Sequence, residues 1–302
     1  MANNIATTLQ RDGIMNGAMM ALREAIPALS LFATTFEANP LLRGSNKVVV
    51  EYHPLDTQPS KDFTYANGYV FDQDTNTASR EVTINKRKYK DLSFTSEELM
   101  RQPHLNVEKK GMRAGQKLIE DVFADILGIV TAANYPALYG PVAAGAFFPD
   151  DLQDIDTIAD ELKWPRSGRS MMINHAYEGN LLKDAVFYKE RYGENNAISE
   201  SRLPRLRGFD IGTTAYIPDN GENLQGMAIY ESAILLGFAP IKPAADGDTI
   251  TYETLSDPDG SGLTIEFREW FDRKFDTMRR TIELNYGTGT GEEDAIIRIP
   301  SQ

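Results

Sequence analysis

Apolar residues in the middle of the chain recur at the spacing of one long amphipathic helix. Between Val107 and Ala133 they fall every three or four residues and form a continuous stripe. The stripe comprises Leu118, Ile119, Val122, Phe123, Ile126, Ile129, Val130 and Ala133. A helix of about 27 residues measures roughly 40 Å. Its first half is basic and its second half acidic, which opposes the helix dipole, so compensating groups are expected outside the helix.

A second helical pattern lies near the N-terminus. It predicts a helix between residues 13 and 36, which Pro27 kinks or ends. The apolar positions are Met15, Met19, Leu22, Ile26 and Leu29. Two interpretations stay open, an ordinary surface helix or an arm that packs on a neighbouring subunit.

The segment that follows is strand-like but mostly polar. The β-branched run from Lys47 to Tyr52 predicts a strand. Residues 62–71 and 80–90 also resemble strands, and the turn-forming residues 72–79 lie between them. This arrangement predicts a long hairpin. Because it has few apolar residues, we expect it to lie on another surface, which can belong to another chain.

The second half of the chain mixes helices and strands. Asp150 or Asp151 can cap a helix, after which the pattern predicts a strand at 169–174 and a helix at 177–187. Residues 226–240 are apolar and should supply core. Alternation of apolar and polar residues near 263–267 indicates a half-buried strand, and 282–286 and 295–299 are similar. The whole pattern predicts an α+β fold.

Composition narrows the class of protein. The 302 residues are 41% hydrophobic and 25% charged, as in ordinary folded proteins that can bury a sizeable core. There is no cysteine, and the formal net charge is −13. This charge argues against a protein that grips nucleic acid, which needs clustered Lys and Arg. The apolar runs are too short to span a bilayer, and no secretory signal pattern is present.

Candidate catalytic and ligand-binding motifs fail on spacing. His53, His104 and His175 are far apart and share no metal-ligand spacing. The run DQDTN at 72–76 lacks the glycine and glutamate of a calcium loop. The run YGTGTGE at 286–292 misses the third glycine of a dinucleotide-binding loop and is interpreted as a flexible connection. The sequence therefore predicts no catalytic residue, no cofactor and no metal.

A set of basic residues on the expected hairpin has two interpretations. Arg80, Lys86, Arg87, Lys88 and Lys90 form either a solvated strand face or a surface that pairs with an acidic neighbour.

The order of elements resembles the major capsid proteins of tailed bacteriophages. The resemblance is carried by SMMINHAYEGNLLKD (170–184), in which Asn174 ends a strand before a helix, by LPRLRGFDIGTTAYIP (203–218) and GMAIYESAILLGFAP (226–240), and by FREWFDRKFDTMRRTIELNYG followed by AIIRI near the end. It implies an N-terminal arm (1–45), an extended β-hairpin loop (46–94), a peripheral domain with a long spine helix (95–149), an axial domain (150–245) and return strands of the peripheral domain (246–302).

The resemblance also implies a function. It implies a capsid protein that self-assembles into hexamers and pentamers, and these form an icosahedral head that encloses double-stranded DNA without sequence-specific binding. The expected partners are further copies of the chain, a scaffolding protein, a portal and decoration proteins, with no membrane. The protein would be made in the host bacterial cytoplasm and end in the virion.

Two alternatives to this function stay open. One is an encapsulin-like compartment shell with the same fold, and the other is an acidic hydrolase that uses two carboxylates. Under the capsid reading, the expected subunit-interface residues are Tyr65, Tyr69, Arg80, Lys86, Arg87, Lys88, Lys90 and Arg113.

Overall fold

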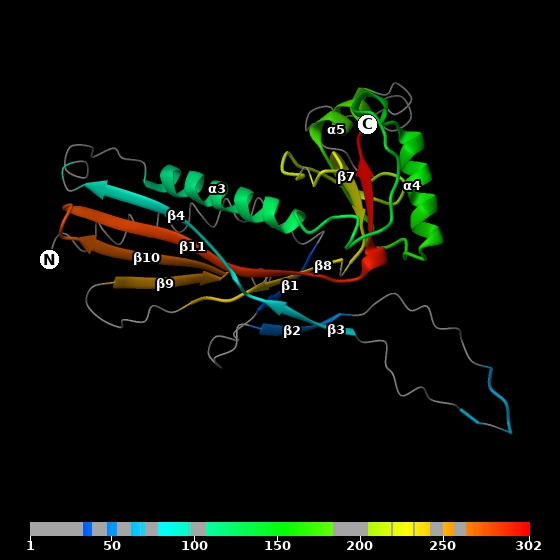
Figure 1. Ribbon diagram of the computed structural model, residues 1–302, viewed down its shortest axis with the longest axis horizontal. Helices are drawn as coiled ribbons and strands as arrows, with labels where there is room; N and C mark the ends of the chain where they lie inside the picture. Colours follow the sequence, from blue (N-terminus) through cyan, green and yellow to red (C-terminus); the bar gives the residue numbers. More distant parts are fainter. Residues whose placement is uncertain are drawn as a thin grey trace.

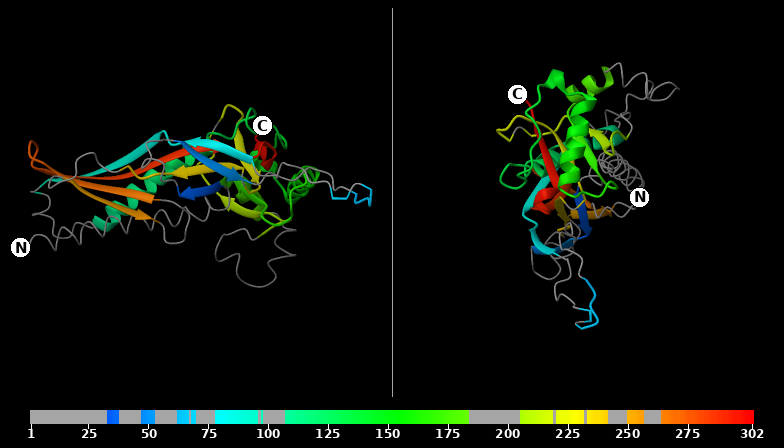
Figure 2. Two further views of the ribbon diagram at one scale, coloured as in Figure 1. Left: turned by 90° about the horizontal axis from the view of Figure 1, so that it is seen from below. Right: turned by 90° about the vertical axis from the view of Figure 1, so that its right-hand side faces the viewer.

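The protein forms two lobes, one long and one compact (Figure 1). The computed structural model describes residues 33–37, 47–52, 62–66, 68–69, 78–95, 97, 107–183, 205–218, 220–231, 233–241, 250–256 and 264–302. The long lobe is a six-stranded sheet with one long helix along it, and the compact lobe holds two shorter helices and a second sheet. The left-hand view of Figure 2 shows that the long strands and the long helix both extend along the length of the long lobe.

The six-stranded sheet is built around one central strand, β11, which pairs with β4, β8 and β10. Its strands are β1 (Ala33–Glu37), β4 (Lys86–Thr95), β8 (Ile234–Phe238), β9 (Ile250–Ser256), β10 (Thr264–Asp272) and β11 (Thr277–Thr290). The parallel pairing of β1 with β8 corrects the sequence analysis, which placed residues 33–36 in a helix. The rest of that expected helix lies outside the described residues. Pairing with a buried strand outweighed the local helical spacing.

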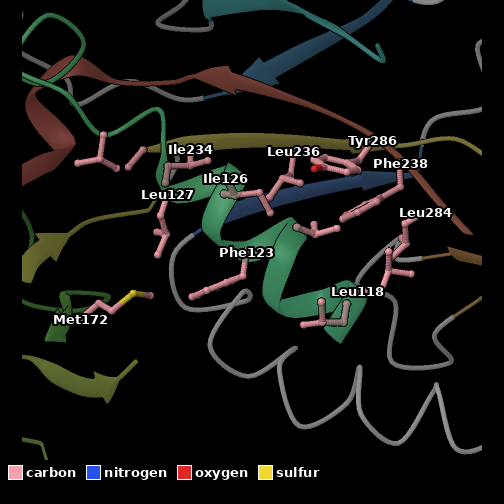
Figure 3. Packing of buried hydrophobic residues seen from close by; sticks show 14 of the residues in the cluster. Leu118, Phe123, Ile126, Leu127, Met172, Ile234, Leu236, Phe238, Leu284 and Tyr286 are labelled. Atoms are coloured by element: carbon pink, nitrogen blue, oxygen red, sulfur yellow. The ribbon is translucent and has the colours of Figure 1, made fainter. Parts of the chain in front are cut away.

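The long helix α3 (Val107–Leu127) covers one face of this sheet. Leu118, Ile126 and Leu127 on the helix pack with Leu236, Phe238, Leu284 and Tyr286 on the strands (Figure 3). The helix ends six positions before the expected Ala133, because Gly128 follows Leu127. Beyond that point the side chains of Asn134 and Asn220 donate hydrogen bonds to the carbonyl oxygens of Ile129 and Val130, respectively.

The compact lobe is organised by a four-stranded sheet that is buried on both faces. Its order is β12 (Ile296–Pro300), β7 (Leu224–Ile229), β5 (Ser170–Ile173) and β6 (Asp210–Thr213). One face packs on α4 (Pro149–Glu161) and α5 (His175–Lys183) through residues such as Met171 and Ile297. The other face sends Met172, Met227 and Ile296 into the core beneath α3. The second sheet is therefore a wall shared by both cores.

The order of strand and helix in the compact lobe agrees with the prediction from the sequence. The expected strand at 169–174 is β5, and the helix after it is α5. The Asn174 side chain accepts a hydrogen bond from the Tyr177 backbone N–H at 2.9 Å, which caps α5. The N-cap of α4 is Phe148 and neither Asp150 nor Asp151, because the helix begins at Pro149. Asp151 lies in the first turn, where its side chain accepts a hydrogen bond from the Phe148 N–H at 2.6 Å. Short 3₁₀ helices at η2 (Ala144–Ala146) and η3 (Glu293–Ala295) complete the elements.

The expected long hairpin is wrong in its pairing. The strand β2 (Lys47–Tyr52) pairs with β3 (Ala78–Thr83), and the next strand, β4, leaves this ribbon to join β11. Of the expected strand at 62–71, residues 62–66 and 68–69 are described, and they form a turn closed by a hydrogen bond from the Gly68 N–H to the Thr64 carbonyl oxygen (2.8 Å). Of the expected tip at 72–79, Ala78 and Ser79 are described, and both belong to β3.

Residues 286–290 of the run YGTGTGE belong to β11 and do not form a flexible connection. Gly287 and Gly289 pair with Gly237 and Leu235 at the end of β11. A Cβ atom on Gly287 would lie 2.3 Å from the carbonyl oxygen of Thr83, where the chain passes from β3 to β4 across β11. Glycine is needed there for this close backbone approach.

Candidate assembly surfaces

The segment around residue 65 presents aromatic side chains away from both lobes. The Phe63 ring lies 5.3 Å from the Tyr65 ring and 4.8 Å from the Tyr69 ring, between centroids. Tyr65 is 99% exposed and Tyr69 78% exposed. Figure 1 shows this segment at the lower right, far from the sheets. We call residues 62–66 and 68–69 the loop tip. Aromatic rings that are this exposed to water would gain stability from burial against an apolar surface.

The basic residues expected on a free hairpin have partners within the chain. Arg80 donates to the carbonyl and hydroxyl oxygens of Thr290 at 3.0 and 2.8 Å, and it pairs with Glu293 at 3.4 Å. Lys88 donates to the backbone oxygen of Asp121 on α3 at 2.7 Å. These contacts attach β3 and β4 to the body. The acidic half of α3 is thus compensated by β4 of the same chain.

The contact between α3 and β4 centres on Asp125. Its carboxylate lies 2.8 Å from the Lys86 ammonium and accepts a hydrogen bond from the Tyr286 hydroxyl at 2.8 Å. Burial alone would raise the pKa of Asp125, but the hydrogen bonds from Lys86 and Tyr286 outweigh it and lower the pKa. Burial, together with the hydrogen bond to Asp125, raises the pKa of Tyr286.

Lys90 and Arg113 differ from this set, because neither has an ion pair among the residues that the structure describes. Lys90 lies on β4 and Arg113 on α3, and both are exposed. Their assignment to an interface, like that of the other six expected residues, stays a prediction.

On the side of the six-stranded sheet away from α3, the part formed by β4, β10 and β11 is polar, and we call this part the polar face. At its centre Glu283 pairs with the Arg87 guanidinium at 2.5 Å and with Arg268 at 3.4 Å. Glu266 is fully buried, pairs with Arg268 at 3.1 Å and accepts the Ile241 N–H at 2.8 Å. Alternation along β10 predicted Phe267 inside, but it did not reveal that Glu266 is buried on the opposite face.

A groove of about 570 Å³ follows this polar face between β4, β10 and β11. Tyr89 and Trp270 line it together with Arg87, Asp91 and Arg279. A groove with aromatic walls and both signs of charge suits recognition of a protein surface. In the sequence, the signal for this groove is the set of polar positions in the alternating strands. Alternation by itself indicates only that these positions face solvent.

No group of residues in the described ranges forms a metal site. No cluster of three or more His, Asp or Glu side chains that could hold a metal occurs in them. His175 is exposed and lies 3.2 Å from Glu178 on the same helix, whereas His53, His104 and the run DQDTN lie outside the described residues. None of the described helices is both long and apolar enough to cross a membrane.

Comparison with known proteins places the fold. No family model matches the sequence, and no curated protein matches it. The capsid structure of the cyanophage P-SCSP1u superposes with a TM-score of 0.57 at 11% identity, over 90% of this chain and 86% of that chain. The mature capsid of bacteriophage PhiM1 gives 0.54 at 13% identity, over 89% and 85%. The chain has the tailed-phage capsid fold.

The capsid fold extends to a particle from an archaeon. A virus-like particle from Pyrococcus furiosus matches with a TM-score of 0.50 at 14% identity, over 97% of this chain and 98% of that chain. These matches cover both lobes, so the α+β architecture expected from the sequence is confirmed at the level of the fold.

Proposed function

We propose that this protein is a capsid subunit, a structural protein rather than an enzyme. The observation that carries the proposal is the capsid fold, which matches structures of assembled shells over most of both chains. On this proposal the copies form hexamers and pentamers that close an icosahedral head in the virion. The head encloses double-stranded DNA without sequence-specific binding, which agrees with the net charge of −13.

The regions take the following roles in the proposal. Residues 1–45 form an arm, and 46–94 contain the extended loop, whose own ribbon is β2 with β3. The long lobe is the peripheral domain, made of residues 95–149 with the return strands at 246–302. The compact lobe corresponds to the proposed axial domain, residues 150–245, except that β8 within this range lies in the six-stranded sheet of the long lobe and β12 from the C-terminus is added.

The loop tip is proposed to dock on a neighbouring copy. Tyr65 and Tyr69 are the anchors, because large exposed aromatic rings supply most binding energy in protein interfaces. Arg80, Lys86, Arg87 and Lys88 hold the root of the loop to the body in this proposal, so the tip is presented from a fixed base. A scaffolding protein, a portal and decoration proteins are the further partners we propose, with assembly in the host bacterial cytoplasm.

The deciding experiment is size-exclusion chromatography with light scattering, followed by negative-stain microscopy of the largest species. Closed particles, or hexamers and pentamers that convert to particles with a co-expressed scaffold, would support the capsid role. A monomer or dimer that never assembles would overturn it. Particles that protect DNA from nuclease favour the viral head, whereas particles filled with one enzyme favour an encapsulin-like compartment.

A variant pair isolates the loop tip. The double substitution Tyr65→Ser with Tyr69→Ser should leave the subunit folded but raise the protein concentration needed for assembly by about tenfold or more. Tyr65→Phe with Tyr69→Phe keeps both exposed rings and is the matched control. Equal assembly of all three proteins would contradict docking of the tip.

A further inference from the structure

The outer face of α4 carries an acidic stripe. Asp150, Asp154, Thr157 and Glu161 are exposed and fall on one side of the helix, while Leu152, Ile155 and Ala159 are buried on the other. No Lys, Arg or His among the described residues pairs with Asp150, Asp154 or Glu161. The right-hand view of Figure 2 shows that α4 lies at the outer surface of the compact lobe. This stripe is therefore available to a partner.

A basic corner lies at the C-terminal end of the same helix. We use this name for Lys163, Arg166, Arg205 and Arg207, all exposed. Arg205 donates a hydrogen bond to the backbone oxygen of Arg166 at 2.9 Å, which joins the two loops. Arg166 pairs with Asp160, and Arg205 lies 3.9 Å from Asp210. Within the described ranges Lys163 and Arg207 have no ion pair.

Arg207 stands where the backbone favours another residue. Leu206 and Phe209 close a two-residue turn through hydrogen bonds of 2.9 and 2.8 Å. The central residues Arg207 and Gly208 have φ of 45° and 89°. Asn followed by Gly is the preferred pair for such a turn, and an ordinary side chain at positive φ costs about 1 kcal/mol. The chain keeps a cation here at the expense of local stability.

Lys163 is also a cation at positive φ, but for this residue a second explanation exists. It follows the C-cap residue Leu162 with φ of 60°, a position that glycine usually occupies. A cation near a helix C-terminus gains about 0.3–1 kcal/mol from the helix dipole, which offsets much of the backbone cost. Arg207 has no helix to stabilise. Its charge is better explained by a partner than by the fold of its own chain.

The partner that fits best is a second copy of this chain. Asp160, Asp210 and Glu161 surround the basic corner and would repel a nucleic acid backbone, as would the net charge of −13. The acidic stripe offers the complementary charge. Because α4 is about 20 Å long, its first turn cannot reach the basic corner at the far end of the same helix. The two surfaces can meet fully only between chains.

We propose that the acidic stripe of one subunit binds the basic corner of the next, so that the compact lobes join head to tail in a ring. The contact uses different surfaces on the two copies, as closed rings require. This inference rests on the proposed function as a shell subunit, and it specifies which surfaces of the compact lobe meet.

Two charge-reversed proteins test the contact. The first carries Lys163→Glu with Arg207→Glu, and the second carries Asp150→Lys with Asp154→Lys. Each alone places like charges across the contact and should need about tenfold more protein to assemble, as measured by light scattering. An equal mixture restores opposite charges at every contact of a six-membered ring in which the two proteins alternate. Mixed hexamers should therefore form where neither protein forms them alone.

Folding controls separate charge from stability. Arg207→Asn suits the turn, so the unassembled subunit should be at least as stable as wild type while its assembly weakens. Arg207→Lys keeps the charge and should assemble like wild type. If wild type assembles but both reversed proteins assemble equally well, or if the mixture fails to recover, the head-to-tail contact is wrong and the capsid role stands. If wild type itself never assembles, the capsid role and this contact fail together.

Discussion

The two sheets of this protein differ in what covers their two faces. The four-stranded sheet buries apolar side chains on both sides, Met171 toward α4 and α5 and Met172 toward α3. The six-stranded sheet buries apolar side chains toward α3, and on its other face it buries Leu235 against Val82 of β3. The part of that other face formed by β4, β10 and β11 carries charged residues such as Glu283. The four-stranded sheet is thus covered by its own chain, whereas this part of the six-stranded sheet presents a grooved, charged face that another molecule can contact.

Loss of Arg169 should cause the largest fall in stability, because the compact lobe depends on it. Arg169 is 1% exposed and donates hydrogen bonds to Asp156 at 2.5 Å and Asp160 at 2.6 Å, as well as to the carbonyl oxygens of Trp164 and Pro165. Arg169→Ala strands these acceptors and should lower the free energy of unfolding by about 3–5 kcal/mol in urea denaturation of the unassembled subunit.

Arg166→Ala is the control for this loss, since Arg166 pairs with the same Asp160 at 3.2 Å but is exposed. It should cost less than about 1 kcal/mol. Similar losses for both substitutions would show that burial of Arg169 does not matter.

A clash at Gly287 should cost less but act on the long lobe. Gly287→Ala pushes a methyl group against the Thr83 carbonyl, so the crossing of β3 over β11 must shift. We expect about 2–3 kcal/mol of destabilisation by the same measurement. Gly145→Ala has open space around its Cβ and should be close to neutral. A neutral Gly287→Ala would mean that the crossing is loose.

The contact of α3 with β4 should make stability depend on acid pH. The pKa of Asp125 in the folded chain lies below its ordinary value of 3.8, so its contribution is complete above that value. It is lost as the pH falls through the lowered pKa. Asp125→Asn should cost about 1 kcal/mol at neutral pH and show a flatter loss of stability below pH ~4 than wild type. If wild type and Asp125→Asn lose stability in parallel as the pH falls, Asp125 is not the source of the pH dependence.

The groove on the polar face should show the smallest effect on the subunit itself. Tyr89 is exposed there, so Tyr89→Ser should change the free energy of unfolding by less than about 0.5 kcal/mol. Its effect is expected in assembly, as a higher protein concentration for half-maximal light scattering. Unchanged assembly would leave the polar face as an ordinary solvated surface.

Local sequence patterns predicted most helices and strands, but not which strands pair with each other. The strand Lys47–Tyr52, the start of α3 and the strand expected at 169–174 follow from residues close together in the chain, and all three are in the structure. The departure of β4 from the ribbon to β11 depends on pairing between residues some two hundred positions apart. Alternation cannot choose among such partners, because each strand presents the same pattern to all of them.

The candidate surfaces were predictable only as regions. The sequence indicated Tyr65 and the basic residues near Lys86 as interface candidates. It did not show which of these cations form ion pairs or hydrogen bonds within the same chain. Lys86 meets Asp125 and Lys88 meets α3 because β4 lies beside that helix, which no local pattern reveals. The basic corner was missed for a similar reason. Its members come from two loops that meet only in the fold, although Arg-Gly at 207–208 was a visible turn signal.

The shared wall between the cores limits how this subunit can change shape. Met172 and Met227 are anchored in one core while their neighbours Met171 and Ala228 are anchored in the other. Swinging one lobe against the other would pull side chains out of both packed interiors at once. A shell built from such subunits would have to adjust its curvature by tilting whole bodies against one another or by bending the long strands, because the junction gives it no hinge.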